Sequence, residues 1–231
     1  CLFIYLFNLI MSSQHNQIVQ MYKSRQNILS ILESIYEYDI GDYNGFTFNE
    51  IDAMYKNNQL DMLLTHKIID NKQEKTSKTY IKYHTSSTGQ IATTINEISI
   101  RNIVEDLYNE SDTLTNYDCL FIIMEGEPND SMVNLLKFMY NNEGKFIIVY
   151  NIKRLQFNIL EHSLVPRVTI LSDDEINDFK KKYNVTTVKD MPEISRFDPQ
   201  AQAICLRPGQ ICKFIRNSPT SMETPYFRIC I

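Results

Sequence analysis

Two apolar runs decide the fold of this chain: Cys119-Leu-Phe-Ile-Ile-Met124 and Phe146-Ile-Ile-Val-Tyr150. Each run has the length of one strand and contains no charged side chain, which is typical of strands buried on both faces. Between them, Ser131 to Tyr140 places its apolar residues at helical spacing. A strand, a helix and a second strand in close succession predict a βαβ unit with parallel strands. The sequence therefore predicts an α/β domain around this stretch.

Upstream, the spacing of apolar residues predicts further elements. Helical periodicity predicts one amphipathic helix over Ile18–Tyr36 and a second over Phe46–Leu64, with Asn57 and Asn58 as a candidate interruption of the second. Strict alternation over Thr76–His84 predicts a strand with one wet face, and Ser86–Gln90 has the composition of a turn. Ile95–Tyr108 is interpreted as a strand followed by a helix. Residues 11–157 are expected to form one N-terminal domain.

The first ten residues are set apart from this domain. Cys1 to Ile10 are almost entirely apolar and precede the first methionine, Met11. The run is about half the roughly 20 residues that a membrane-spanning helix needs, and it lacks the basic start and small residues of a secretory signal. We expect residues 1–10 to be an upstream extension of the reading frame, the alternative being an authentic apolar extension.

The sequence changes character after Asn158, where short elements with clear start signals follow one another. Ser172-Asp-Asp-Glu175 has the spacing of a capping box and predicts a helix to about Tyr183. Asp198-Pro199 predicts the start of a short helix to about Cys205. Strands are expected over Arg167–Leu171, Ile211–Arg216 and Tyr226–Ile231, the last two joined by residues 217–225. Residues 158–231 are thus expected to form a small α+β domain with a mixed sheet.

Charge and cysteine content exclude several classes of protein. The 231 residues carry 23 Lys and Arg against 28 Asp and Glu, a net charge of −5, without the basic surplus of a free-standing nucleic-acid binder. Residues 162–231 hold 10 basic and 8 acidic residues (+2), which leaves 13 and 20 (−7) for the remainder. This imbalance favours protein docking over a nucleic-acid groove. The five cysteines are scattered without a CxxC pair, which indicates reduced thiols rather than a disulfide framework or a zinc site.

The sequence contains no convincing catalytic or metal-binding constellation. A magnesium-dependent nuclease needs clustered carboxylates and a lysine, and the nearest approach is Asp61 with Asp70-Asn-Lys72. A polar loop over residues 73–78 makes a solvated turn the better interpretation there. Glu125 and Glu127 follow a buried strand but have no third ligand near them in the sequence. The four histidines, His15, His66, His84 and His162, are far apart, so no catalytic residue, metal ligand or cofactor is predicted.

A family resemblance enters at the junction of the two predicted domains. Leu155-Gln-Phe-Asn-Ile-Leu-Glu-His-Ser-Leu-Val-Pro166 resembles the signature of the fifth shared subunit of eukaryotic nuclear RNA polymerases, which has a counterpart in the archaeal enzyme. The resemblance continues in order through Ser172, Glu175 and Met191-Pro192-Glu-Ile194. The family-motif residues, which the resemblance makes candidates for a partner interface, are His162, Leu164, Val165, Pro166, Asp198, Pro199, Gly209, Gln210, Lys213, Arg216, Ser218, Thr220, Tyr226 and Arg228.

The upstream part resembles the same family more thinly. Tyr22-Lys-Ser-Arg25 and Ile28–Leu32 resemble the opening helix of the eukaryotic-type jaw domain, and the βαβ unit falls where that domain has one. The family's jaw domain is itself similar to endonuclease folds. The archaeal counterpart lacks this domain, so the chain looks eukaryotic-like. Its richness in Asn, Ile, Lys and Tyr indicates an AT-rich genome, as in a large DNA virus or an AT-rich protist.

The resemblance implies a non-catalytic subunit of a multisubunit DNA-dependent RNA polymerase. Its C-terminal domain would dock on the largest subunit, and its N-terminal domain would form part of the lower jaw near downstream DNA. Lys213, Arg216 and Arg228 would face an acidic or carbonyl-rich partner surface, the alternative being an ion pair of Arg216 or Arg228 with Asp198. Two other functions stay open, a magnesium-dependent nuclease of restriction-endonuclease-like fold and a free transcription adaptor. The expected location is the nucleus, or a virion or cytoplasmic virus factory if the chain is viral, with no membrane association.

Overall fold

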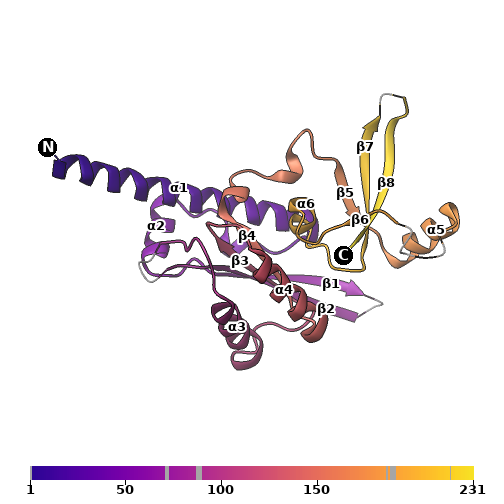
Figure 1. Ribbon diagram of the computed structural model, residues 1–231, viewed down its shortest axis with the longest axis horizontal. Helices are drawn as coiled ribbons and strands as arrows, with labels where there is room; N and C mark the ends of the chain where they lie inside the picture. The colour runs from indigo at the N-terminus through magenta and orange to yellow at the C-terminus, as the bar shows by residue number, and fades with distance from the viewer. Residues whose placement is uncertain (1, 71–72, 87–89, 186, 188–190, 219) are drawn as a thin grey trace. The chain divides into compact units, whose positions relative to one another are not determined.

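The computed structural model describes residues 2–70, 73–86, 90–185, 187, 191–218 and 220–231. The chain divides into two compact units, Cys1–Phe157 and Asn158–Ile231 (Figure 1). We call them the N-terminal unit and the C-terminal unit. Among the described residues, no helix combines the length and the apolar character needed to cross a bilayer.

The N-terminal unit is built on a four-stranded mixed sheet. In sheet order the strands are β1 (Met62–Asp70), β2 (Gln73–Tyr83), β3 (Cys119–Met124) and β4 (Phe146–Asn151). β1 and β2 form an antiparallel hairpin, whereas β2, β3 and β4 run parallel. All residues of β3 and β4 are buried, as the two apolar runs require. The predicted βαβ unit is therefore confirmed.

Helix α4 (Asp130–Glu143) makes the crossover between β3 and β4. Asn129 begins it by accepting a hydrogen bond from the Met132 N–H, and Gly144 ends it in the left-handed conformation at φ +70°. Its inward face buries Met132, Leu135, Leu136 and Met139.

The two faces of this sheet receive different helices (Figure 1). α1 (Leu2–Tyr36) lies on the face that carries Tyr83, whose hydroxyl is 3.1 Å from that of Ser24. α3 (Glu97–Glu105) and α4 lie on the opposite side. The predicted helix over Ile18–Tyr36 is confirmed, and it begins earlier than expected, because the chain is already helical from Leu2, within the apolar segment that precedes Met11.

The predicted second helix over Phe46–Leu64 is wrong in its second half. α2 spans only Phe48–Lys56, begun by a capping box between Thr47 and Glu50 and ended at Asn57. Asn58 then takes a left-handed conformation at φ +53°, which a continuing helix does not tolerate. Leu60, Met62 and Leu64 are all buried, and this period of two belongs to the approach to β1 and to the strand itself.

Two other local predictions need correction. Residues 73–78, expected to be a polar loop, form the first half of β2, because they pair with β1 from Asp70↔Gln73 onward. Ile95–Tyr108 contains no strand; it holds α3 followed by one π-helical turn over Asp106–Glu110. The predicted strand over Thr76–His84 is confirmed within β2. Most of the predicted turn at Ser86–Gln90 lies outside the described residues.

The C-terminal unit holds a second mixed sheet, with β5 (Arg167–Ile170), β7 (Ile211–Ser218), β8 (Met222–Cys230) and β6 (Glu193–Ile194) in that order. β7 pairs antiparallel with β5 and β8, and β6 pairs parallel with β8. The α+β domain with a mixed sheet is as predicted. The strands of the hairpin are longer than expected, because residues 217–218 and 222–225 continue the ladder instead of forming a long connection.

Both helices of the C-terminal unit begin where the sequence predicted. α5 (Asp173–Tyr183) has the Ser172–Glu175 capping box, and α6 (Pro199–Ala203) is capped by the Asp198 carboxylate, which accepts from the Gln200 N–H at 2.9 Å. Phe179 of α5 packs with Met191 and Ile211, together with the partly buried Phe227 and Ile229. This cluster covers one face of the β7–β8 hairpin.

Candidate functional site

Four of the family-motif residues lie in the loop that precedes β5. The short 3₁₀ turn Ile159–Glu161 delivers the chain to His162, whose carbonyl accepts from the Val165 N–H at 2.9 Å. The Pro166 carbonyl accepts from Gln200 Nε2 of α6 at 2.7 Å, which ties the loop to the body of the unit. Leu164 stands at the bend with 86% of its surface exposed. The loop is thus fixed at both ends and presents an apolar side chain to solvent.

This loop forms one wall of an open groove, and the part of the hairpin near its tip forms the other. The groove has a volume of about 730 Å³ and lies entirely within the C-terminal unit. Its lining comes from the loop and from the strand residues near the hairpin tip: Leu160, Glu161, His162, Ser163, Leu164, Val165, Pro166, Arg167, Ile215, Arg216, Asn217 and Glu223. Five family-motif residues, from two separated parts of the sequence, therefore line the same groove.

Arg216, Tyr226 and Arg228 form a stack on one face of the hairpin. The guanidinium carbons of Arg216 and Arg228 lie 4.6 and 5.3 Å from the centroid of the Tyr226 ring. Stacking of this kind holds the guanidinium plane while its N–H groups stay available. Arg228 donates one of its N–H groups to the Glu193 carbonyl, at 3.3 Å. Asp198 caps α6, and within the described part of the chain it forms no ion pair with either arginine, so the predicted ion-pair alternative is wrong here.

Lys213 does not belong to this stack. Side chains alternate along a strand, so Lys213 projects from the face opposite to Arg216. There it approaches Glu175, whose pKa is lowered first by hydrogen bonds from the Ser172 backbone and hydroxyl and then by the charge of Lys213. The three cations expected on one partner surface are therefore split between two faces.

The remaining family-motif residues shape the unit. Asp198 and Pro199 begin α6, as described above. Gly209 has φ +89° with no atom near where a Cβ would stand, so the turn requires its backbone conformation and not its lack of bulk. The Gln210 side chain accepts from the Arg207 N–H across this turn. Ser218 and Thr220 share a hydroxyl–hydroxyl hydrogen bond of 3.2 Å at the hairpin tip.

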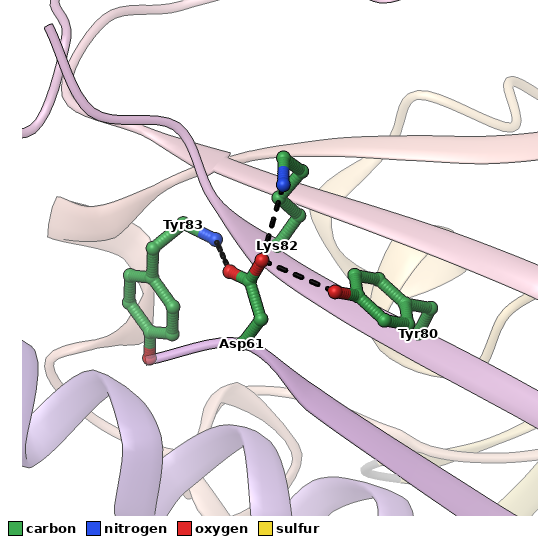
Figure 2. Close-up of polar contacts among 4 residues, drawn as sticks. All are labelled: Asp61, Tyr80, Lys82 and Tyr83. Atoms are coloured by element: carbon green, nitrogen blue, oxygen red, sulfur yellow. Dashed lines mark hydrogen bonds and ion pairs between the residues drawn. The ribbon is translucent and has the colours of Figure 1, made fainter. Parts of the chain in front are cut away.

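The carboxylates proposed for a nuclease do not meet. Asp61 immediately precedes β1 and Asp70 ends it, so the strand itself separates them by about 30 Å. Lys72 lies outside the described residues. Asp61 instead lies beside β2, where it accepts hydrogen bonds from Tyr80, Lys82 and the Tyr83 backbone at 3.2, 3.1 and 3.1 Å (Figure 2). The group that contacts Asp61 beside Lys82 is the Tyr80 hydroxyl, whereas a magnesium site would need a second carboxylate there.

The Asp61 cluster lines a polar pocket of about 300 Å³ that sequence reasoning missed. The pairing of Met62 with Ile81 places Asp61 opposite Lys82. This register could not be predicted from the sequence, because β1 was not recognised as a strand. Desolvation is the main cause that raises the pKa of Tyr80, with the Asp61 charge second. Burial and the nearby Lys82 lower the pKa of His84, which favours the neutral form of this imidazole. The three hydrogen bonds that Asp61 accepts hold the hairpin to the loop before it.

The other candidate acids and the thiols have structural partners. Glu127 pairs with Arg154 at 2.9 Å, and Glu125 lies 3.7 Å from Lys153. Across the described residues, no group of three or more His, Cys, Asp or Glu side chains is placed to hold a metal ion. Four cysteines are described, and all are buried free thiols. Burial raises the pKa of Cys212 to about 11 and that of Cys230 to about 12, so both thiols are unreactive at neutral pH.

Comparison with known proteins identifies the family of the C-terminal unit. Residues 157–230 match the family model described as RNA polymerase Rpb5, C-terminal domain. The DNA-directed RNA polymerase subunit Rpo5 of Thermococcus kodakarensis is 36% identical over 76 residues, which cover 33% of this chain and 92% of that subunit. The Rpo5 subunits of Pyrococcus abyssi and Thermofilum pendens are 37% and 38% identical over 76 and 74 residues, with 92% and 91% of each subunit covered. This chain therefore belongs to the Rpb5/Rpo5 family of DNA-directed RNA polymerase subunits, which act in transcription, and its C-terminal unit is the part that carries the membership.

Proposed function

We propose that the C-terminal unit attaches this chain to the largest subunit of a multisubunit RNA polymerase. One observation carries the proposal. The junction signature and three residues of β7, Ile215, Arg216 and Asn217, line one open groove. Elsewhere in the unit, α5 packs on the sheet through a hydrophobic cluster. Within the unit, Leu164 at 86% exposure has no role in packing, and an exposed apolar side chain beside a groove is typical of a protein interface.

The proposed role is assembly, without chemistry of its own. The family consists of non-catalytic polymerase subunits, so nucleotide addition and its magnesium belong to other chains. The nuclease alternative has little support in the structure, because Asp61 and Asp70 lie at opposite ends of β1 and the oxygens of Asp61 are occupied by three donors.

For the N-terminal unit we propose a position in the lower jaw, beside downstream DNA. Its mixed α/β architecture and the likeness of Tyr22–Arg25 to the jaw helix support this role. Its net charge of −6, from 13 basic and 19 acidic residues over 1–157, gives it no electrostatic attraction for phosphates by itself. Contact with DNA would therefore arise from the way the complete polymerase positions this unit.

Affinity purification of the full chain from producing cells tests the proposal. We expect the largest polymerase subunit to copurify at a ratio of one to one, as measured by quantitative mass spectrometry. Recovery well below that ratio would favour the free transcription adaptor. A polymerase that is complete without this chain would overturn the proposal.

The location of the chain follows from that assembly. We propose the nucleus for a cellular protein, and the virion or a cytoplasmic virus factory for a viral one. Fluorescent tagging together with the largest subunit would show whether the two coincide.

A further inference from the structure

The groove in the C-terminal unit has an open sheet edge along one wall. In an antiparallel ladder, alternate residues direct their N–H and C=O groups away from the partner strand. The Ile211 carbonyl accepts from Leu171 on the β5 side, and the Ile229 N–H donates to Pro192 on the β6 side, so the outward-facing residues of both strands are the odd-numbered ones. β5 accompanies β7 only as far as Arg167↔Ile215. Asn217, the next outward-facing residue, therefore presents its backbone groups to the groove with no described strand beside it.

The opposite edge of the hairpin is less suited to such pairing. β6 pairs with Ile229 and Cys230 only, so the earlier part of β8 is also a free edge. Pro225 occupies an outward-facing position there, and its ring removes the N–H that an added strand would need. Of these two unpaired stretches of the β7–β8 hairpin, the one at Asn217 faces the groove and keeps its backbone N–H.

The groove also offers an apolar contact. Leu164 lies 86% exposed on one wall, beside Val165 and Pro166, and Ile215 lies on the other wall. A branched apolar side chain inserted between them would remove all of these groups from water. Such burial adds to the affinity that main-chain hydrogen bonds provide when an extended segment binds a sheet edge, and it selects the side chain that is bound.

The charges that line the groove are mixed, and Arg216 differs from the others in the way its guanidinium is held. Glu161 and Glu223 balance Arg167 and Arg216, so the groove has no positive surplus with which to bind the phosphates of a polynucleotide. Arg216 lines the same groove, is held over the Tyr226 ring at 4.6 Å, and has no carboxylate partner among the described residues. A guanidinium held in this way is prepared for a bidentate bond to a carboxylate.

We propose that the groove receives an extended polypeptide segment of the largest polymerase subunit, which pairs with the β7 edge at Asn217. The segment carries an apolar residue that packs on Leu164 and an Asp or Glu whose carboxylate binds Arg216. The inference rests on the proposed assembly with the polymerase and specifies where and how one contact is made.

Matched surface variants of the full chain test this contact in the same copurification. We expect Leu164→Ser, Arg216→Gln and Asn217→Pro each to lower the recovered largest subunit about ten-fold or more. Met222→Ser is the control for the first, because Met222 is 84% exposed but does not line the groove. Lys181→Gln is the control for the second, because Lys181 is an exposed cation of α5 that does not line the groove. Both controls should stay within about two-fold of the wild type.

Tyr226 positions the Arg216 guanidinium, so substitutions of its ring should change the recovery of the largest subunit. Tyr226→Leu should weaken recovery, and Tyr226→Phe, which keeps the ring face, should restore it. Urea unfolding midpoints of all variants would show that the fold is intact. Equal recovery of groove variants and controls would overturn the groove proposal while leaving the proposed function in place. Failure of the wild type to recover any polymerase subunit would instead overturn the proposed function.

Photocrosslinking identifies the chemistry of the bound segment. A benzoylphenylalanine placed at position 164 should crosslink to a polymerase peptide that contains an apolar residue close to an Asp or Glu. Replacement of that acidic residue by Lys should be compensated in part by Arg216→Glu. A crosslinked peptide without acidic residues, or a crosslink to nucleic acid, would contradict the proposal.

Discussion

Arg25 carries a positive charge into the interior of the N-terminal unit, where 2% of its surface stays exposed. Its guanidinium donates to the Leu60 carbonyl at 3.0 Å and lies over the rings of Tyr43 and Phe46 at 5.6 and 5.3 Å. Burial lowers the pKa of this group, although not enough for an arginine to lose its proton at neutral pH. Arg25 belongs to a stretch that resembles a family motif, and its buried contacts hold α1 to the loop before β1.

We expect Arg25→Ala to destabilise the protein by about 3 kcal/mol, because it removes packing and leaves the Leu60 carbonyl unsatisfied. Arg25→Met should cost less, since it keeps most of the volume and removes a desolvated charge. Urea unfolding measures both. The matched control is Lys56→Ala, which breaks an exposed ion pair with Asp52 and should change stability by about 0.5 kcal/mol or less. A larger loss for Met than for Ala would contradict this account.

The capping box of α5 makes the stability of the C-terminal unit depend on pH. Hydrogen bonds from Ser172 lower the pKa of Glu175 below its ordinary value of 4.5. A lowered carboxyl pKa stabilises the folded state above the ordinary value, and that stabilisation is lost as pH falls through the lowered value. Wild type should therefore exceed Glu175→Gln in urea midpoint at pH 7, and the difference should shrink as the pH falls below 4.5 and through the lowered pKa. A difference that is constant with pH would show that the charge of Glu175 plays no part.

Individual elements were predictable where one physical signal dominated. β3 and β4 are continuous apolar runs, and α5 has a complete capping box, so the structure agrees with the sequence there. Leu60, Leu63 and Leu64 fit a helix as well as Leu60, Met62 and Leu64 fit a strand, and only pairing with β2 decides between them. The same pairing creates the Asp61–Lys82 contact, so the error in β1 concealed that cluster. The groove depends on two segments about 50 residues apart, which no local pattern connects.

The turns that flank α4 contain two glycines that are needed for different reasons. Gly144 needs its positive φ of +70°, while a Cβ there would meet only Asn116 atoms at 3.6 Å or more. Gly126 needs its lack of bulk, because a Cβ there would fall 2.0 Å from the Thr93 carbonyl oxygen. Gly144→Ala should cost about 1 kcal/mol. Gly126→Ala should cost about 2–3 kcal/mol, because backbone must move. Thermal unfolding of the two variants gives the order, and a smaller loss for Gly126→Ala would contradict it.

At the scale of the whole molecule, charge decides what the chain can bind without its partners. The net charge is −5, and the modest positive surplus of residues 162–231 is +2. Nonspecific DNA binders gain their affinity by neutralising several phosphates with Lys and Arg, which gives dissociation constants of about 10⁻⁴–10⁻⁶ M at physiological salt. Of the cations in the C-terminal unit, Lys213 and Arg216 face opposite sides of the hairpin, so they cannot follow one phosphate backbone.

We therefore expect the isolated full chain to bind duplex DNA more weakly than about 10⁻⁴ M at roughly 150 mM salt, as measured by fluorescence anisotropy. With magnesium it should leave supercoiled plasmid intact, because Asp61 is engaged by three donors and no carboxylate cluster exists among the described residues. Arg216→Gln should leave this weak binding unchanged, although the same change weakens attachment to the polymerase. Micromolar DNA binding by the chain alone, or nicking that Asp61→Ala abolishes, would mean that the N-terminal unit acts on DNA directly and does not depend on the polymerase to bring DNA to it.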